Sequence, residues 1–416
     1  MACIALVVPA TTYRAANFLE AATALQAEVV VASDQSHVLA ETMGDRALRI
    51  DLAHPEAAAE RLATHAERKP FDAIVGIDDR GVEIAALASQ RLGLRHSPPA
   101  AVAATRNKAR LRAILEGAAD VRQPRWTVVG DPAEAARAAA TIGFPVVVKP
   151  VSLSASRGVI RADDEEEALA AAERSLAIVA EAGEEPELLV ERYVDGEEVA
   201  LEGLVRDGTL VPLALFDKPD PLVGPFFEET LYTTPSRLPS AVQTRIEEAA
   251  QAVVDGVGLS EGPVHAEFRL GGDDVWVLEL ASRTIGGLCG SILRFGLDMS
   301  LEEVVLRQAL DLPLHALARE STATGVMMLP VARAGTLVEV AGVDAARAVP
   351  GIEGVEVTVR AGQTVRPLPE ADRYLGFAFA RDRTPEAVEE SLRTAYAKLD
   401  VRIELGATVG SPCDSD

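Results

Sequence analysis

Two glutamates on a predicted β-hairpin are the clearest chemical feature of the sequence. Glu267 and Glu279 lie in two short apolar runs, which the glycine-containing connector 271–274 joins. With a three-residue loop at 272–274, Glu267 lies directly opposite Glu279, and opposed Cβ atoms are about 4.5–5.5 Å apart. Such carboxylates repel each other unless a cation lies between them, and hard oxygen ligands suit Mg²⁺ carried with phosphates. The alternative is a register that points one carboxylate to solvent.

An arginine and two glycines follow this hairpin. Arg283 lies four residues beyond Glu279, and Gly286 and Gly287 come shortly after it. The guanidinium is a planar donor that can bind an anion through two parallel hydrogen bonds. This segment therefore predicts a bidentate cation and open backbone amides at the same end of the sheet as the glutamates.

A lysine at the end of another predicted strand marks a second candidate anion site. Lys149 ends the apolar run 144–150, and the loop beyond it contains Ser154, Ser156 and Gly158. Small residues let backbone N–H groups approach an anion closely, and the lysine adds a positive charge at the same place. An ordinary hairpin with an exposed lysine is the alternative interpretation of this segment.

A third candidate site is the acidic linker in the segment 188–198. The pattern predicts a strand that runs into a short linker, turns at glycine and resumes as a strand. The linker contains Glu191 and Val194, and Glu198 follows the turn. Its backbone groups can bind the edge of an adenine, and nearby carboxylates can accept hydrogen bonds from ribose hydroxyls. A solvated acidic turn is the alternative.

The elements that must position these residues fall into three regions. In the first hundred residues, apolar runs at 3–8, 28–32 and 73–77 alternate with helical patterns at 13–27 and 81–92. This alternation predicts βαβ units and a parallel sheet. No G-x-G-x-x-G follows the first strand, so the scaffold is Rossmann-like without the dinucleotide-binding turn.

The other two regions have a different pattern of strands, helices and turns. From Trp126 to about residue 290, short β-branched strands and glycine turns predict an α+β region rich in antiparallel sheet. From about residue 325, short strands and one helix over 385–399 predict a further domain. A chain of 416 residues is long enough for two or three domains, each with its own core.

Composition and missing motifs exclude several classes of protein. The net charge of 40 − 64 = −24 argues against a nucleic-acid partner. Cys3, Cys289 and Cys413 lie too far apart for a disulfide framework or a cysteine-based zinc site. The P-loop, H-E-x-x-H, G-x-S-x-G and C-x-x-C motifs are absent, and the six histidines are scattered. No apolar run spans a membrane, and the first strand lacks the basic flank of a signal peptide, so we expect a cytoplasmic protein.

Taken in order, these motifs resemble those of the ATP-grasp superfamily of carboxylate–amine and carboxylate–thiol ligases, over nearly the whole chain. Within it, the sequence looks most like the L-amino acid ligases, the dipeptide-forming branch that includes carnosine synthase. The segment 224–236 is similar to their substrate loop, and 335–399 to an accessory domain shared with biotin carboxylase. The resemblance implies an α/β and α+β multidomain fold. The expected parts are a Rossmann-like domain at 1–98, an ATP-grasp domain at 99–320 with a lid at about 126–195, a biotin-carboxylase-like accessory domain at 321–410 and a disordered tail at 411–416.

The resemblance also implies roles for residues that would bind ATP and metal. The residues expected at the nucleotide are Lys108 and Lys149 on the phosphates, Ser154, Ser156 and Gly158 in the closing loop, Glu191 and Val194 beside the adenine, and Glu198 on the ribose. Glu267 and Glu279 are expected to hold Mg²⁺, with Mn²⁺ as an alternative. Many ATP-grasp enzymes carry a further metal-binding Asn where this chain has Ala281, which leaves the number of metal ions open.

The expected substrate residues lie in two segments. By the same resemblance, Arg283 binds the transferring phosphoryl group or the acyl-phosphate, and Gly286 and Gly287 line the donor carboxylate. Glu229 receives the amino group of an amino-acid donor, and Tyr232 stands where this branch often has His. The identities of the donor and the amine therefore stay open.

The implied activity is an ATP-dependent ligase that forms an amide through an acyl-phosphate and releases ADP and phosphate. Its partners are a small-molecule carboxylate and an amine, and a homodimer is a further expectation from the resemblance. One alternative is a bicarbonate-activating carboxylase or a purine-pathway relative. Another is a nucleotide-binding protein without turnover, which would be expected to lack Glu267, Glu279 or Arg283.

Overall fold

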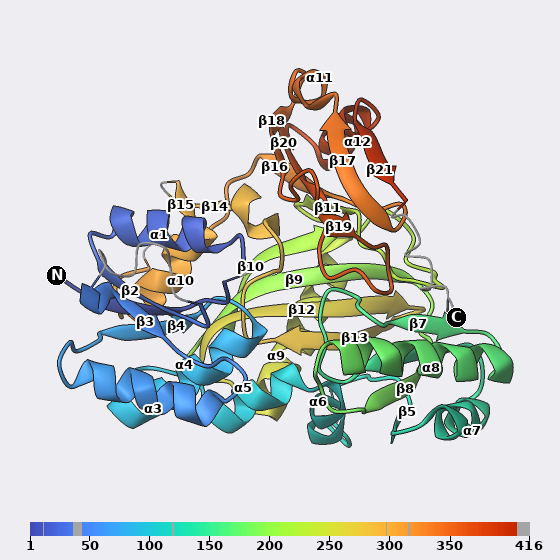
Figure 1. The fold of residues 1–416 in the computed structure, drawn as a ribbon, viewed down its shortest axis with the longest axis horizontal. Coiled ribbons are helices and arrows are strands. Elements are labelled where there is room, and N and C mark those ends of the chain that lie inside the picture. Colours follow the sequence, from blue (N-terminus) through green and yellow to red (C-terminus); the bar gives the residue numbers. More distant parts are fainter. Residues whose placement is uncertain (11, 36–43, 119, 297, 315–316, 406–416) are drawn as a thin grey trace, which may run out of the picture.

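The computed structural model describes residues 1–10, 12–35, 44–118, 120–296, 298–314 and 317–405. The predicted tail 411–416 and Cys413 lie outside the described residues. Figure 1 shows the N-terminal region in blue, a long central sheet in yellow-green, a lid in teal and green, and the C-terminal region in orange and red. Within the described residues, no helix is both long enough and apolar enough to cross a membrane.

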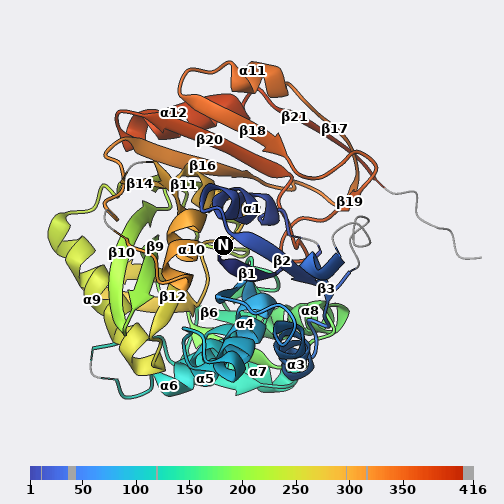
Figure 2. The ribbon, with the colours of Figure 1, turned by 90° about the vertical axis from the view of Figure 1, so that its left-hand side faces the viewer.

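The predicted alternation of strands and helices in the N-terminal region is confirmed. Its elements are β1 (Cys3–Val7), α1 (Ala15–Ala24), β2 (Glu28–Ser33), η1 (Gly44–Arg46), β3 (Ala47–Arg49), α3 (Pro55–Ala66), β4 (Ala73–Gly76) and α4 (Asp79–Leu92). The strands form a parallel sheet in the order β3-β2-β1-β4. Helices α3 and α4 cover one face, and α1 covers the other together with α10 (Leu301–Ala309) from later in the chain (Figure 2). The strands are continuous apolar runs because both faces are covered.

The central sheet has eight antiparallel strands. They are β9 (Glu197–Arg206), β10 (Thr209–Asp217), β11 (Leu231–Thr234), β12 (Glu261–Gly271), β13 (Asp274–Ala281), β16 (Ala323–Leu329), β18 (Ile352–Val357) and β20 (Gly376–Asp382). Their order is β13-β12-β9-β10-β11-β16-β20-β18, so the C-terminal strands continue the same sheet. Helix α9 (Ser240–Val257) packs its apolar stripe against the strands at the β13 end.

The predicted pairing of the two glutamates is confirmed, although its predicted loop is wrong. Glu267 lies opposite Glu279, as expected. The turn between the strands is one residue shorter than predicted, because Gly271 pairs with Asp274. A β-bulge beside Phe268 places one extra residue in β13 and restores the pairing of the glutamates.

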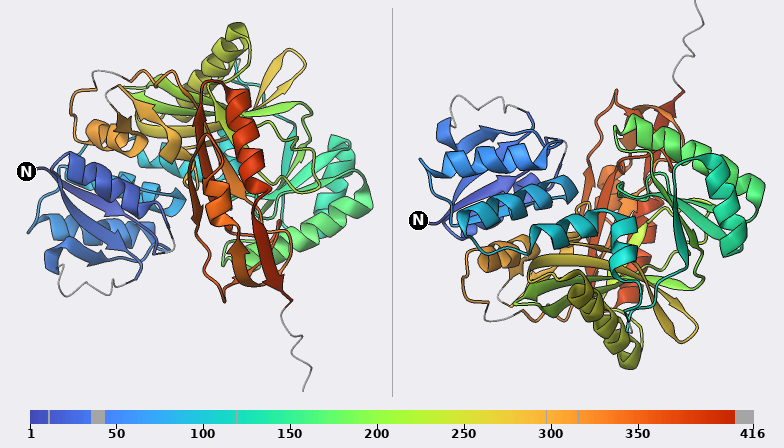
Figure 3. Two further views of the ribbon diagram at one scale, coloured as in Figure 1. Left: turned by 90° about the horizontal axis from the view of Figure 1, so that it is seen from above. Right: turned by 90° about the horizontal axis from the view of Figure 1, so that it is seen from below.

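A four-stranded antiparallel sheet with two helices forms the lid. Its elements are β5 (Trp126–Val129), α7 (Pro132–Ile142), β6 (Val146–Pro150), β7 (Ile160–Ala162), α8 (Glu165–Glu181) and β8 (Leu188–Arg192), in the strand order β5-β8-β6-β7. The helices pack on the buried face of the sheet and form a separate core. Figure 3 shows the lid and the N-terminal region at opposite ends of the molecule, with the C-terminal region between them in the view from above.

The remaining elements connect and complete these parts. They are α5 (Pro99–Arg106), α6 (Lys108–Ile114), η2 (Cys289–Ile292), β14 (Arg294–Phe295), β15 (Met299–Ser300), β17 (Gly335–Ala341), α11 (Val343–Arg347), β19 (Thr364–Val365), α12 (Pro385–Tyr396) and β21 (Asp400–Glu404). The predicted C-terminal helix is α12, and it packs on β16 and β20. A small sheet in the order β19-β17-β21 lies beside it.

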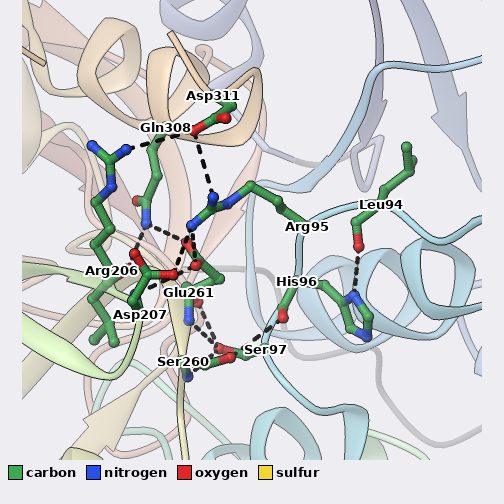
Figure 4. Close-up of polar contacts among 11 residues, drawn as sticks. Leu94, Arg95, His96, Ser97, Arg206, Asp207, Ser260, Glu261, Gln308 and Asp311 are labelled. Atoms are coloured by element: carbon green, nitrogen blue, oxygen red, sulfur yellow. Dashed lines mark hydrogen bonds and ion pairs between the residues drawn. The ribbon is translucent and has the colours of Figure 1, made fainter. Parts of the chain in front are cut away.

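A cluster of polar contacts fixes the N-terminal region to the central sheet (Figure 4). Arg95 forms ion pairs with Glu261 on β12, with Asp207 at 3.2 Å and with Asp311 at 3.5 Å. The Ser97 hydroxyl donates to the Glu261 carbonyl oxygen over 2.6 Å. These contacts hold the first region in a fixed place beside the sheet that carries the paired glutamates.

Candidate active site

A cavity of about 670 Å³ lies where the N-terminal region, the lid, the central sheet and the C-terminal region meet. The residues singled out in the sequence gather around it. Those that line it are Lys108, Lys149, Ser154, Ser156, Glu191, Val194, Glu198, Glu229, Tyr232, Glu267, Glu279, Arg283, Gly286 and Gly287. Gly158 is the exception, because its N–H group donates to the carbonyl oxygen of Pro369 over 2.9 Å.

The paired glutamates have different neighbours. Glu279 lies 3.2 Å from the ammonium of Lys108. Glu267 lies 3.1 Å from Lys218 and 3.5 Å from Nε2 of His265. Burial alone would raise the pKa of Glu267, but the nearby Lys218 and His265 hold that pKa well below its usual range. Two opposed carboxylates of this kind fit a hard cation, and Ala281, at the position where many ATP-grasp enzymes are expected to carry Asn, adds no ligand.

Lys218 is the centre of a buried charge cluster that sequence reasoning missed. It directly follows β10, and its side chain is 2% exposed. Its ammonium lies 2.7 Å from Glu198 and 3.1 Å from Glu267, and it also contacts Glu229. Oxygen atoms of these three glutamates all lie within 4.8 Å of one another. The ammonium also lies 5.1 Å from the ring centroid of Tyr232, which is itself buried.

Lys149 and Glu191 form a buried pair at the base of the lid. The Lys149 ammonium contacts the Glu191 carboxylate, and Arg112 of α6 donates to the same carboxylate over 3.2 Å. Burial would raise the pKa of Glu191, but Lys149 and Arg112 hold it below its usual value. The carboxylate expected beside the adenine is therefore already paired with two cations, Lys149 and Arg112. This pairing holds Lys149 at the cavity wall.

Lys108 is hydrogen-bonded to the loop that follows Lys149 and contains Ser154 and Ser156. Lys108 begins α6, which Asn107 caps. The Lys108 backbone N–H donates to Val151 over 2.9 Å, and its ammonium donates to the carbonyl oxygen of Leu153 over 2.7 Å. The loop therefore keeps its shape beside both lysines, with backbone at positive φ at Ser156.

Arg283 connects the central sheet to the N-terminal region. Its Nε atom donates to Asp79, the first residue of α4, over 2.6 Å. Burial opposes the charged form of Arg283, but Asp79 raises its pKa. Gly287 lies at a φ of +63°, and a Cβ there would come within 2.8 Å of the Phe377 ring. This segment therefore needs glycine where it lines the cavity beside the guanidinium.

Contacts with the C-terminal region fix the position of the lid sheet and its helices. Arg174 of α8 makes two hydrogen bonds to Glu370, at 2.6 and 2.9 Å. In the reverse direction, Arg366 makes two hydrogen bonds to Glu181 of α8, at 2.9 and 2.7 Å. Bidentate pairs of this kind fix orientation as well as distance. With the Pro369 contact to the loop, they seat the lid over the cavity.

His265 is a second residue that sequence reasoning left among the scattered histidines. Its Nδ1 atom lies 3.1 Å from Glu202, and the carboxylate of Glu202 also accepts the backbone N–H of Ile285 over 3.0 Å. Glu202 therefore fixes both His265 and the segment after Arg283. The sequence did contain a signal for His265. It lies two residues before Glu267 in β12, and residues two apart in a strand share a face.

We expect the free energy of unfolding of the metal-free protein to decrease as the pH rises from about 6.5 to about 9, because His265 loses its proton over this range. Burial lowers the pKa of His265, but Glu202 and Glu267 together raise it to about 9. A raised pKa stabilises the folded state fully below the unfolded value and loses that contribution as pH rises through the folded value. The difference corresponds to roughly 3 kcal/mol. Urea midpoints in EDTA across this range should fall in the wild type but not in His265→Gln. The exposed control His54→Gln should behave as the wild type.

The sequence matches three described domain families. Residues 142–292 match the ATP-grasp domain, residues 19–96 match the ATP-grasp N-terminal domain, and residues 327–404 match the L-amino acid ligase C-terminal domain 2. The alanine–anticapsin ligase of Bacillus subtilis strain 168 is 30% identical over 285 residues, which cover 62% of this chain and 59% of that protein. The chain thus spans about 60% of the length of such curated relatives.

Two further comparisons extend over more of the chain. The formate-dependent phosphoribosylglycinamide formyltransferase of Synechococcus sp. is 27% identical over 337 residues, 80% of this chain and 79% of that one. The crystal structure of L-amino acid ligase from Bacillus licheniformis aligns with a TM-score of 0.80 and 24% identity, over 97% of this chain and 99% of that one. The predicted multidomain fold is therefore confirmed. Residues 142–292 therefore form an ATP-grasp domain, with a domain of the ATP-grasp N-terminal type before it and a domain of the type described at the C-terminus of L-amino acid ligases after it.

Proposed function

We propose that the protein is an ATP-dependent carboxylate–amine ligase that forms an amide through an acyl-phosphate. The observation that carries this proposal is the meeting of paired carboxylates and three cations around one cavity. Glu267 and Glu279 oppose each other on one hairpin, and Lys108, Lys149 and Arg283 line the same cavity. Phosphoryl transfer needs positioning and charge stabilisation far more than a covalent nucleophile, and this set of residues supplies both.

The nucleotide is proposed to lie between the lid and the central sheet. Lys108 and Lys149 bind the phosphates, and Ser154 and Ser156 close over them from the lid. Glu191 and Val194 border the adenine, with Glu191 acting through the position of Lys149 rather than as a free carboxylate. Glu198, which Arg269 holds at 2.9 Å, faces the ribose.

Glu267 and Glu279 are the proposed Mg²⁺ ligands, because two opposed carboxylates near two lysines form a hard-donor set for an ion carried with phosphates. When bound, Mg²⁺ neutralises charge on the phosphates of ATP. The residues of the chain hold the nucleotide in place, and Arg283 stabilises the transferring phosphoryl group. Asp79 keeps the guanidinium of Arg283 oriented toward the cavity.

An amino acid is the proposed donor. Gly286 and Gly287 line its carboxylate, and Glu229 faces its amino group beside Tyr232. The donor carboxylate attacks the γ-phosphate of ATP and releases ADP. An amine then attacks the acyl-phosphate, and phosphate leaves. The lid contacts at Arg174 and Arg366 exclude water from this intermediate while it waits for the amine.

Phosphate release with ATP and Mg²⁺ against a matrix of amino acids and amines tests the proposal, with mass detection of the products. We expect release to require a carboxylate and an amine together, and the product to be lighter by one water than their sum. Hydroxylamine in place of the amine should trap the acyl-phosphate as a hydroxamate. Release that bicarbonate alone supports would instead indicate a carboxylase, the reaction class of the alternative. Release that requires a phosphoribosyl amine would favour a purine-pathway relative.

A further inference from the structure

The loop that carries Glu229 contacts the lid as well as the central sheet. It spans residues 218–230, between β10 and β11, and is called the donor loop below because Glu229 is proposed to bind the donor. The lid carries Lys149, Ser154 and Ser156, which are proposed to bind the phosphates of ATP. The two proposed substrates are therefore bound by two segments whose contacts decide whether the sites act independently.

Arg161 of β7 makes the main contact between the lid and the donor loop. Its backbone N–H donates to the carbonyl oxygen of Pro225 over 2.9 Å, and its Nη1 atom donates to the carbonyl oxygen of Val223 over 2.9 Å. The neighbouring Ile160 forms a β-bridge with Phe226. Because β7 is the edge strand of the lid sheet, the donor loop is hydrogen-bonded to that edge.

Close packing at two further positions joins the same segments. Gly224 has a φ of +93°, and a Cβ at this position would lie 2.9 Å from the Cβ of Arg161. The guanidinium of Arg174 lies 5.0 Å from the ring centroid of Phe226, while the same side chain makes its two hydrogen bonds to Glu370. A side chain of the lid thus contacts both the donor loop and the C-terminal region.

The donor loop also reaches the proposed adenine end of the cavity. Phe227, two residues before Glu229, lines the cavity and stacks on Tyr193 with ring centroids 6.4 Å apart. Tyr193 directly precedes Val194 in the linker that is proposed to border the adenine. The loop that is proposed to bind the donor therefore packs against the wall that is proposed to bind the nucleotide.

Two guanidinium groups hold this aromatic contact in place. Arg161 lies 4.5 Å from the ring centroid of Tyr193, and Arg269 of β12 lies 5.0 Å from it. Arg269 is 3% exposed and donates to the carbonyl oxygen of Val194 over 2.9 Å and to that of Leu222. Arg269 fixes the linker and the donor loop to the central sheet, and Arg161 fixes the same loop to the lid.

We propose that the nucleotide and the donor bind cooperatively, and that Arg161 is the positioning residue that couples the lid to the donor loop. A nucleotide that fixes the lid also fixes the donor loop, so the donor no longer has to order that loop itself. By thermodynamic linkage, the donor tightens nucleotide binding by the same factor. The proposal rests on the proposed function, because it takes the two substrate sites from it.

Hydrogen exchange with the Mg²⁺ complex of AMP-PNP, and with no donor present, tests the link itself. In the wild type we expect the nucleotide to slow amide exchange in the lid strands and in the donor loop. In Arg161→Gln the lid should keep its protection, while the added protection of the donor loop should fall by roughly 3- to 10-fold. Arg161→Lys should recover part of this protection, and the exposed Arg137→Gln of α7 should behave as the wild type.

Calorimetric titration of AMP-PNP with and without the donor that the matrix identifies measures the coupling. We expect the donor to tighten nucleotide binding in the wild type by about 5- to 150-fold, the range typical of coupled sites. Arg161→Gln and Gly224→Ala should each bring this factor toward one. Gly208→Ala is the control for backbone strain, because φ there is +80° and no other part of the described chain comes within 4 Å of an added Cβ.

The outcomes separate this inference from the proposed function. A wild type that forms no hydroxamate with any carboxylate would overturn the ligase function and this inference with it. Hydroxamate formation with a coupling factor near one in the wild type, or with an unchanged factor in both Arg161→Gln and Gly224→Ala, would overturn this inference alone. These two changes lie on opposite sides of one contact, so a factor that falls in both and persists in Arg137→Gln and Gly208→Ala supports it.

Discussion

Lys218→Met is expected to destabilise the central sheet by about 3–5 kcal/mol and to stop turnover. The Lys218 ammonium contacts Glu198, Glu229 and Glu267, whose side chains are 9%, 17% and 21% exposed. Without it, three desolvated carboxylates remain close together, and removing one partner of a buried ion pair costs more than the pair contributes. Urea midpoints in EDTA measure the effect, and the exposed Lys398→Met is the matched control.

Divalent ions should partly restore the variant. Because oxygen atoms of the three glutamates lie within 4.8 Å of one another, a cation can take the place of the lost ammonium. We therefore expect Mg²⁺ or Mn²⁺ to raise the urea midpoint of Lys218→Met more than that of the wild type. A variant as stable as wild type in EDTA would contradict the charged cluster, and a variant that still turns over would show that Lys218 is not needed in the site.

The part of the site that is local in sequence was predictable. The pairing of Glu267 with Glu279 follows from the alternation of two short strands and a turn. The prediction reached the correct pair by assuming one extra loop residue, whereas the chain uses a shorter turn and a bulge in β13. A bulge leaves no distinctive residue pattern here, so only the backbone could reveal it.

The parts of the site that depend on long-range packing could not be found from spacing. Asp79 and Arg283 are 204 residues apart, and Arg14 and Thr284 are 270 residues apart. A weaker signal was present, because the Asp pair 78–79 follows a parallel strand at its carboxyl end, where ligands bind in open α/β sheets. Lys218 carried a signal similar to that of Lys149, because Lys149 lies near the end of the buried strand β6 and Lys218 directly follows β10.

Gly158 shows why a loop pattern alone does not assign each of its members. The Ser/Gly composition of the loop predicted backbone N–H groups open to an anion. In the structure, the N–H group of Gly158 instead binds Pro369 from the C-terminal region. Its Cβ position would come within 2.8 Å of the Pro150 ring, so the glycine serves the close packing of the lid. Which amide faces a ligand depends on a segment more than 200 residues later.

Glu279→Gln is expected to lower Mg²⁺-dependent ADP formation by about 100-fold or more while leaving the fold intact. The change keeps the size of the side chain but removes the charge that faces Glu267 across the hairpin. Stability should hold because the Glu279 side chain is 26% exposed and its partner Lys108 keeps its hydrogen bond to Leu153. Titration of ADP formation with Mg²⁺ and with ATP separates loss of metal affinity from loss of turnover at saturation.

A matched control is Glu247→Gln, on the exposed side of α9 and away from the cavity. If Glu279 is a metal ligand, Glu279→Gln should need a higher Mg²⁺ concentration for half-maximal rate, and Glu247→Gln should not. If Glu279 only orients Lys108, the Mg²⁺ requirement should stay unchanged and the KM for ATP should rise instead, because the lysine faces the proposed phosphate site. If Glu279→Gln turned over at the wild-type rate, the opposed pair of carboxylates would not be needed for the reaction. The proposed phosphoryl transfer would then depend on the lysines and Arg283 alone.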